Sequence, residues 1–206
     1  MLGEKFDEAL KLASELHREQ TRKETPVPYL AHLMAVAGIV LEANAYHQFD
    51  NIEDIAIGAL LHDAIEDQGH QINLEDIRQR FGDTVHDIVR DCSDATIEEE
   101  GQEKAPWRER KEAYISKVRH KPHATILVSC ADKLHNARSI MFDYAKIGDE
   151  IWDRFKPTKE ETLWYYESLC EAFQQAWPEN PLLPDFEAVV ARMRKAVMDD
   201  LKIVPL

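Results

Sequence analysis

Four ionisable side chains follow an apolar segment of the chain. His62, Asp63, Glu66 and Asp67 occur within six positions directly after the apolar run at 55–61. A run that is apolar on every side indicates a helix buried in the core. On one continuous helix, residues four positions apart stack, so His62 would lie over Glu66. Asp63 would lie over Asp67 in the same way. Three buried carboxylates are costly unless a cation neutralises them, so the pattern predicts a cation site.

The alternative for these acids is that the helix reaches solvent after residue 61 and leaves them hydrated. Acids at a helix C-terminus face the unfavourable end of the helix dipole, so this alternative also requires a compensating positive charge.

Two further candidates lie in other apolar segments. Asp132 follows the apolar stretch at 124–131 and shares a helix face with Asn136. An aspartate inside such a helix is more often functional or paired than idle. His32 lies three positions after Tyr29 on another apolar segment. Taken alone, His32 is more simply interpreted as a core histidine.

Two imidazoles and two carboxylates together form one candidate metal site: His32, His62, Asp63 and Asp132. Without a cysteine ligand, this mixed nitrogen and oxygen set suits Mn²⁺, Fe²⁺ or Mg²⁺ better than structural zinc. Four protein ligands leave room for water on a six-coordinate ion, and a metal-acidified water is a nucleophile. Glu66 and Asp67 need not be ligands, and we expect them to orient or deprotonate that water.

The elements that must position these residues are helices. Apolar residues recur with a period near 3.6, and only 7 glycines argue against a turn-rich all-β fold. The run ATILVSCA alone is ambiguous between strand and helix, but it continues without a turn into DKLHNARSIM, which favours one long helix. We expect an all-α fold, an acidic loop at 94–106, and helices at about 6–16, 29–45, 51–68, 74–81, 84–92, 107–119, 123–145, 159–177 and 185–202.

Composition limits the possible partners. The 206 residues include 25 Lys and Arg against 39 Asp and Glu, which gives a net charge of −14 and argues against binding of bulk DNA. An anionic ligand would need a local basic pocket. No apolar run approaches the roughly 20 residues that cross a bilayer, so no membrane contact is expected. The first ten residues lack the pattern of a signal peptide, which predicts a cytoplasmic protein with three free cysteines.

Several short strings carry a more specific resemblance. An Arg-Lys pair at 22–23 precedes PYLAH at 28–32, LLHDAIED occupies 60–67, and INLEDIRQRFGDTVHDIV follows at 72–89. A second Arg-Lys pair lies at 110–111, and CADKLHNA lies at 130–137. The spaced His, His-Asp and Asp set resembles the HD phosphohydrolase superfamily. The combination is similar to the hydrolase domain of RelA/SpoT homologues and, in size, to small alarmone hydrolases, including metazoan SpoT homologues.

The resemblance covers roughly residues 5–175 and implies an HD-domain helical bundle. We expect a single HD hydrolase domain at 1–177, with an extension at 178–206 that adds a C-terminal helix to the same domain. The implied activity is Mn²⁺-dependent removal of the 3′-pyrophosphate of ppGpp or pppGpp, which leaves GDP or GTP. A chain of this length has no room for a synthetase domain, so we expect it only to degrade its substrate.

The resemblance also implies residue roles. The four candidate ligands would bind the metal, and Glu66 with Asp67 would handle the water. Arg22 and Lys23 would hold the guanine nucleotide, with the guanidinium stacked on the base. Three further residues would contact the substrate. Asn136 would lie near the ribose-phosphate, and Lys111 and Tyr165 would lie near phosphates.

Three alternatives remain open. The first is an HD phosphohydrolase acting on another nucleotide, such as an NADPH phosphatase or a nucleotidase. The second is an antitoxin that removes pyrophosphate from tRNA 3′ ends beside a toxin partner. The third is a catalytically inactive module that senses nucleotides, and the complete ligand set argues against it.

Overall fold

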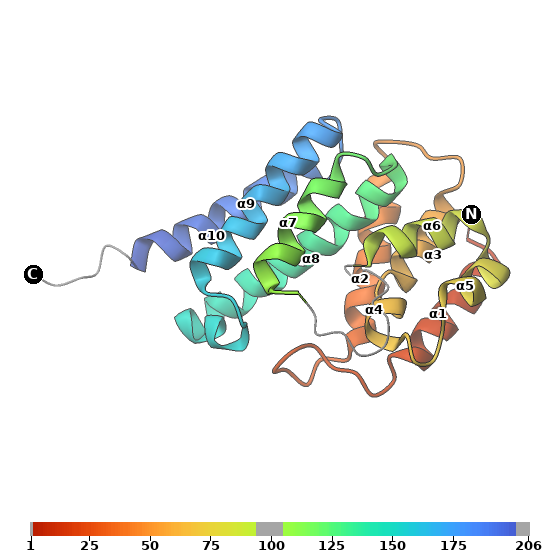
Figure 1. Ribbon diagram of the computed structural model, residues 1–206, viewed down its shortest axis with the longest axis horizontal. Coiled ribbons are helices and arrows are strands. Elements are labelled where there is room, and N and C mark those ends of the chain that lie inside the picture. Colours follow the sequence, from red (N-terminus) through yellow and green to blue (C-terminus); the bar gives the residue numbers. More distant parts are fainter. Residues whose placement is uncertain (1, 94–104, 201–206) are drawn as a thin grey trace, which may run out of the picture. The chain divides into compact units, whose positions relative to one another are not determined.

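The protein is described by a computed structural model that covers residues 2–93 and 105–200, and every regular element in those ranges is a helix (Figure 1). The expected all-α fold is therefore confirmed, and ATILVSCA is helical. The elements are α1 (Glu4–Leu16), α2 (Tyr29–Ala43), α3 (Ile52–Leu61), α4 (Ala64–Gln68), α5 (Leu74–Phe81), α6 (Asp83–Cys92), α7 (Trp107–Val118), α8 (His123–Ile147), the 3-10 helix η1 (Gly148–Arg154), α9 (Lys159–Ala176) and α10 (Leu183–Asp200). Most of the acidic loop expected at 94–106 lies outside the described residues.

The chain divides into two compact units. The first comprises Met1–Ala105 and Lys121–Asp132, and the second comprises Pro106–His120 and Lys133–Leu206. The division therefore falls within α8. The domain boundary at residue 177 that the sequence suggested stays a prediction. No helix of the described residues has the length and apolarity to span a membrane.

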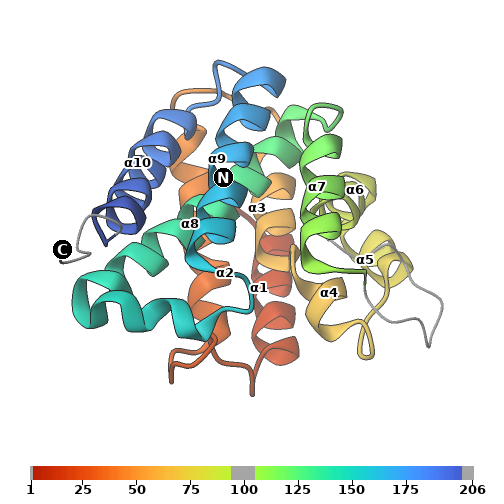
Figure 2. The ribbon, with the colours of Figure 1, turned by 60° about the vertical axis from the view of Figure 1, so that its left-hand side comes forward.

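Helix α3 is the centre of the first unit. It packs against α1, α2 and α6, and α1 to α3 lie side by side (Figure 2). All seven residues from 55 to 61 are buried, as the run without a polar face predicted. A helix covered on several sides offers a fixed frame for the side chains at its end.

Close packing between α3 and α6 depends on a glycine. A Cβ placed on Gly58 would lie 2.7 Å from Cγ2 and 3.0 Å from Cβ of Ile88. Since Ile88 is branched at Cβ and is itself buried, these atoms cannot swing aside as the tip of a long side chain would. Gly58 therefore permits a helix approach that any larger residue would obstruct.

The helix expected at 51–68 is interrupted after residue 61, and the stacking of His62 over Glu66 and of Asp63 over Asp67 stays a prediction. Helix α3 ends at Leu61, Asp63 has φ −98° and ψ 0°, and α4 begins at Ala64. Adjacent residues on a regular helix point about 100° apart. The interruption lets two consecutive side chains turn toward the same place.

Glycine and capping residues set other helix ends. Gly82 ends α5 with φ +89°, in the left-handed region that glycine enters without a steric cost, as its position after residue 81 predicted. Asn73 and Thr158 each form a capping box at the start of α5 and α9. The 3-10 helix η1 was not predicted.

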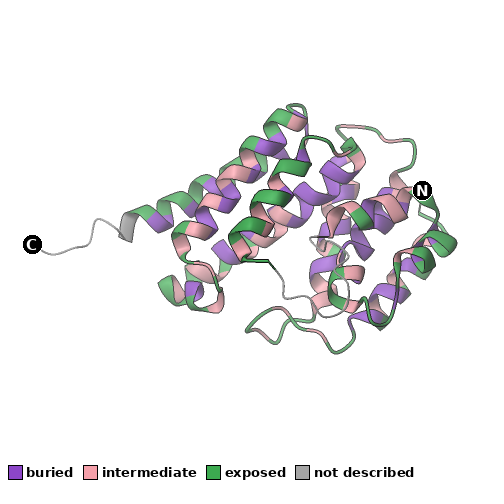
Figure 3. Cartoon of the chain, in the orientation of Figure 1, coloured by how far each residue is buried: buried purple, intermediate pink, exposed green. Residues whose placement is uncertain are grey.

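Helices α9 and α10 pack against each other in the second unit. Buried positions alternate with exposed ones along α10 (Figure 3), and Phe186, Val190, Met193 and Val197 form its buried side. The rings of Phe173 and Phe186 lie 5.7 Å apart between the two helices. The expected helix near residues 185–202 therefore contributes to the core of this unit.

Candidate metal centre

The four candidate ligands lie in the first unit, on two helices and on the turn between α3 and α4. His32 is in the first turn of α2, His62 follows α3, Asp63 precedes α4, and Asp132 is on α8. His32, His62 and Asp132 are buried, with exposed fractions of 1%, 2% and 6%. Asp63 is partly buried, with 19% of its side chain exposed. The fold thus brings together residues that span a hundred positions of sequence.

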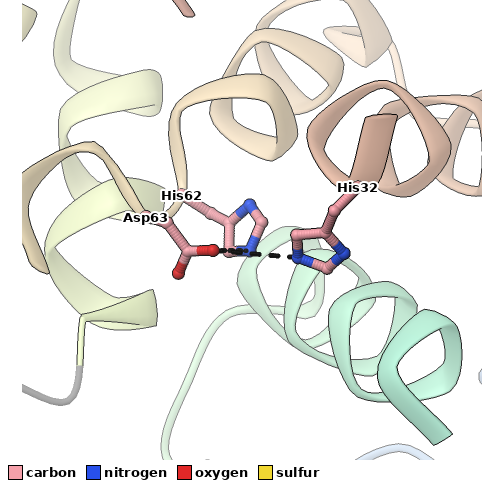
Figure 4. A group of neighbouring side chains, drawn as sticks. All are labelled: His32, His62 and Asp63. Atoms are coloured by element: carbon pink, nitrogen blue, oxygen red, sulfur yellow. Dashed lines mark ion pairs between the residues drawn. The ribbon is translucent and has the colours of Figure 1, made fainter. Parts of the chain in front are cut away.

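Two imidazole nitrogens and two carboxylate oxygens converge at this centre. Nε2 of His62 lies 3.0 Å from Oδ2 of Asp63 and 3.6 Å from Oδ1 of Asp132. Nε2 of His32 lies 3.2 Å from Oδ1 of Asp132 and 3.7 Å from Oδ2 of Asp63. Figure 4 shows the side chains of His32, His62 and Asp63 turned toward one another. One ligand atom from each of these three lies within 4.8 Å of the others.

The tautomer of His62 is defined by the main chain. Nδ1 lies 2.8 Å from the carbonyl oxygen of Ala59, which can only accept, so Nδ1 carries the hydrogen. Nε2 is then the nitrogen that faces the two carboxylates and that would offer its lone pair to a bound cation. It is buried and makes no hydrogen bond of acceptable geometry among the described residues. Several lone pairs that face one another in a buried site fit a cation, and a divalent metal matches this donor set.

Burial and the facing charges shift the pKa values of three groups at this centre. Burial opposes the charged form of His62, but Asp63 and Asp132 outweigh it and raise the pKa of the imidazole well above its usual value. Burial likewise opposes ionisation of Asp63, yet His62 holds the pKa of this carboxyl below its usual value. Burial lowers the pKa of His32. The carboxylates therefore favour positive charge between them.

Two residues beside the centre were not assigned a role from the sequence. The hydroxyl of Tyr29 donates a hydrogen bond of 2.7 Å to Oδ2 of Asp63, and the ring of His17 stacks on Tyr29 with centroids 5.3 Å apart. Burial and the nearby carboxylates raise the pKa of Tyr29, so its phenol stays protonated and can donate. The PYLAH string contained Tyr29, but nothing in the spacing indicated its partner.

The two candidate water-handling residues lie on α4. Glu66 and Asp67 are both exposed, and they begin three positions after Asp63. The backbone N–H of Asp67 donates to the carbonyl of Asp63 at 2.9 Å. Oδ2 of Asp67 accepts a hydrogen bond of 2.7 Å from Gln20, which lies 47 residues earlier in the chain. The pair therefore lies about one helical turn after a candidate ligand.

Arg22 and Lys23 lie in the connection between α1 and α2, also in the first unit. An antiparallel bridge joins Thr21 to Pro28 across this connection. The backbone N–H of Arg22 donates to the carbonyl of Val27 at 2.8 Å. The loop therefore has a defined backbone path that presents both basic residues.

The other three predicted substrate contacts belong to the second unit. Lys111 is on α7, Asn136 is on α8 four positions after Asp132, and Tyr165 is on α9. Nζ of Lys111 lies 5.1 Å from the ring centroid of Tyr165, a cation–π contact. Trp107 lies against the same ring, with centroids 5.9 Å apart. Two residues selected separately from the sequence are therefore neighbours.

These features define a class of protein. The chain belongs to the HD-domain family, whose model matches residues 9–157. It is 31% identical over 134 residues to the guanosine-3′,5′-bis(diphosphate) 3′-pyrophosphohydrolase MESH1 of Danio rerio, an alignment that covers 65% of this chain and 67% of the relative. MESH1 of Drosophila melanogaster is 32% identical over 137 residues, with coverage of 66% and 69%. The resemblance to hydrolases of the RelA/SpoT-homologue type is confirmed.

Solved structures agree on the fold. A structure described as a metazoan ortholog of SpoT that hydrolyses ppGpp superposes with a TM-score of 0.70 at 24% identity, over 93% of this chain and 97% of that one. The lmo0812 protein of Listeria monocytogenes EGD-e superposes with a TM-score of 0.67 at 27% identity, over 80% and 99%. The expected HD-domain helical fold is therefore confirmed.

Proposed function

We propose that this protein is a metal-dependent hydrolase that removes the 3′-pyrophosphate of ppGpp or pppGpp and leaves GDP or GTP. The observation that carries the proposal is the convergence of two imidazole nitrogens on two carboxylate oxygens at 3.0–3.7 Å. The relatives with 31% and 32% identity are named for this reaction, which supports the choice of substrate.

Four atoms would hold the metal: Nε2 of His32, Nε2 of His62, Oδ2 of Asp63 and Oδ1 of Asp132. This set suits Mn²⁺, which we propose as the ion, and also Fe²⁺ or Mg²⁺. When bound, such an ion supplies a water of lowered pKa and polarises a phosphoryl oxygen.

The side chains of α4 would complete the chemistry. Glu66 and Asp67 lie about one helical turn after the His62-Asp63 pair. They would orient the attacking water and accept its proton. Tyr29 would hold the Asp63 carboxylate in position. The reaction consumes one water and releases GDP or GTP with pyrophosphate.

The substrate is a compact polyanion, and the chain as a whole carries a charge of −14. Binding therefore depends on local cations that offset phosphate charge. Arg22 and Lys23 would bind the base end of the nucleotide, and Asn136 would contact the ribose-phosphate. Lys111 would contact phosphate, and the neighbouring Tyr165 ring would orient its side chain.

A cytoplasmic location also stays a proposal.

Product analysis tests the function. We would incubate the purified protein and Mn²⁺ with ppGpp, pppGpp, NADPH, nucleoside monophosphates and tRNA bearing a 3′-pyrophosphate. GDP and pyrophosphate from ppGpp are expected. Release of single phosphate from NADPH or a monophosphate, or pyrophosphate from tRNA alone, would instead support one of the other HD-domain activities. If the Mn²⁺-loaded protein leaves ppGpp unhydrolysed, the proposal is wrong.

A further inference from the structure

Gln20 connects the end of α1 to the candidate water-handling pair. Its side-chain Nε2 donates to Oδ2 of Asp67 at 2.7 Å. Its Oε1 accepts from Nε2 of Gln68 at 2.8 Å and lies 2.7 Å from Nδ1 of His17. One amide therefore makes three side-chain contacts, two of them with consecutive residues of α4.

The direction of each hydrogen bond follows from the chemistry of the groups. An ionised carboxylate only accepts, so the NH₂ of Gln20 must face Asp67. The carbonyl oxygen then faces Gln68 and His17, and Nδ1 of His17 must carry the hydrogen. Every contact is consistent with a single orientation of the amide, so Gln20 is oriented from both sides.

The backbone of Gln20 is fixed as well. Its N–H donates to the carbonyl of His17 at 3.1 Å, and its carbonyl accepts from the N–H of Tyr29 at 2.9 Å. His17 is 2% exposed and stacks on Tyr29. The same short segment thus supports Asp63 through Tyr29 and Asp67 through Gln20.

We propose that Gln20 is a positioning residue for Asp67. This inference rests on the proposed function. Asp67 is exposed on a five-residue helix, where an aspartate has free rotation unless a partner holds it. The hydrogen bond to Oδ2 restricts rotation of the carboxylate and leaves Oδ1 for a water or its proton. Rotational restriction of this kind affects the rate of the reaction rather than the affinity for substrate.

Two variants of similar size separate positioning from packing. Gln20→Met removes the donor and the acceptor, and Gln20→Glu keeps the shape but replaces the donor with a carboxylate oxygen that repels Asp67. We expect both to lower kcat about 10- to 100-fold on ppGpp with Mn²⁺, as losses of supporting hydrogen bonds do at metal sites, with KM within about 3-fold. The Mn²⁺ content and Tm should match those of the unmodified protein.

The matched control is Gln79→Met on α5. Gln79 is also a glutamine whose Nε2 donates to a carboxylate, Glu75 at 3.1 Å, and it is exposed. This variant should keep full activity. In an Asp67→Ala background, Gln20→Met should cause no additional loss, because the group it positions is gone.

The outcomes are distinct. An active protein in which Gln20→Met or Gln20→Glu retains kcat overturns the role of Gln20 alone. A loss that appears only in KM, or that accompanies a fall in Tm or in Mn²⁺ content, also overturns it, as does an additive loss in the Asp67→Ala background. An unmodified protein that leaves ppGpp intact overturns the proposed function and the inference with it.

Discussion

The hydroxyl of Tyr29 lies 2.7 Å from Oδ2 of Asp63, the same carboxylate oxygen that lies 3.0 Å from Nε2 of His62. One oxygen thus accepts a hydrogen bond from a hydroxyl and also lies beside a candidate ligand nitrogen. Supporting hydrogen bonds of this kind orient ligands and tune their affinity for the ion.

Removal of that hydroxyl tests its role. Tyr29→Phe should weaken Mn²⁺ binding by about 10-fold, because Asp63 loses the group that orients it. Titration calorimetry on the metal-free protein measures the change. Tyr46→Phe is the matched control, because Tyr46 is 85% exposed, and it should bind as the unmodified protein does. Equal affinity in Tyr29→Phe would contradict a supporting role.

Ligand and water-handling roles predict different losses. Asp63→Ala should lose metal and activity together, whereas Glu66→Ala should keep its metal and lose turnover by about 100-fold or more. Elemental analysis of the dialysed proteins, combined with a pyrophosphate assay, distinguishes the two. Full activity in either variant would speak against the assignment.

Metal binding should also stabilise the fold, since the candidate ligands are far apart in the sequence and come together only in the folded chain. Mn²⁺ at about 100 times its Kd should add about 2.7 kcal/mol to the free energy of unfolding. A thermal melt with and without Mn²⁺ would record a rise in Tm that chelator reverses. The same addition should leave Asp63→Ala unchanged, and an equal rise in that variant would place the ion elsewhere.

Two glycines offer a matched test of the packing between α3 and α6. Gly58→Ala forces a methyl group against Ile88 and should cost about 1–2 kcal/mol, because overpacking exceeds the gain in helix propensity. Gly38 on α2 has no atom within 4 Å of the added Cβ, so Gly38→Ala should be neutral or stabilise by up to about 1 kcal/mol. Urea denaturation gives both values. A stabilised Gly58→Ala would refute the close approach.

Cys170 provides a pH-dependent prediction in the second unit. Burial, and then Glu187 and Glu167, raise the pKa of its thiol from 9.0 to about 12. Both effects oppose the thiolate, which is the reactive form, so alkylation by iodoacetamide at pH 8 should be clearly slower than for an ordinary thiol. Peptide mass spectrometry would measure the rate. Glu187→Gln should speed the reaction, and substitution of the exposed Glu160 should not.

Local signals were sufficient for most helices. The 3.6-residue period and Gly82 predicted α5 at its observed bounds, because both its buried side and its stop are local features. The interruption after Leu61 was not predictable in this way. Residues 61–67 contain neither proline nor glycine and suit a helix on both sides. The path changes there because two consecutive side chains face one centre, which is a tertiary requirement.

Residue types indicated the candidate ligands, since buried imidazoles and carboxylates are costly without a cation. Their role in metal binding stays a prediction, although the structure brings all four together. The supporting residues gave no comparable signal. Glutamine and tyrosine are common in loops and helices. The partners of Gln20 and Tyr29 lie 47 and 34 residues away, with no periodic relation.

The hydrogen bond from Nδ1 of His62 to the carbonyl of Ala59 has an evolutionary consequence. Codon changes replace side chains, but every amino acid at position 59 brings a carbonyl to that spot. Ala59 is fully buried in α3, so packing limits which side chains are accepted there, but the nitrogen that His62 presents does not depend on which of them is present.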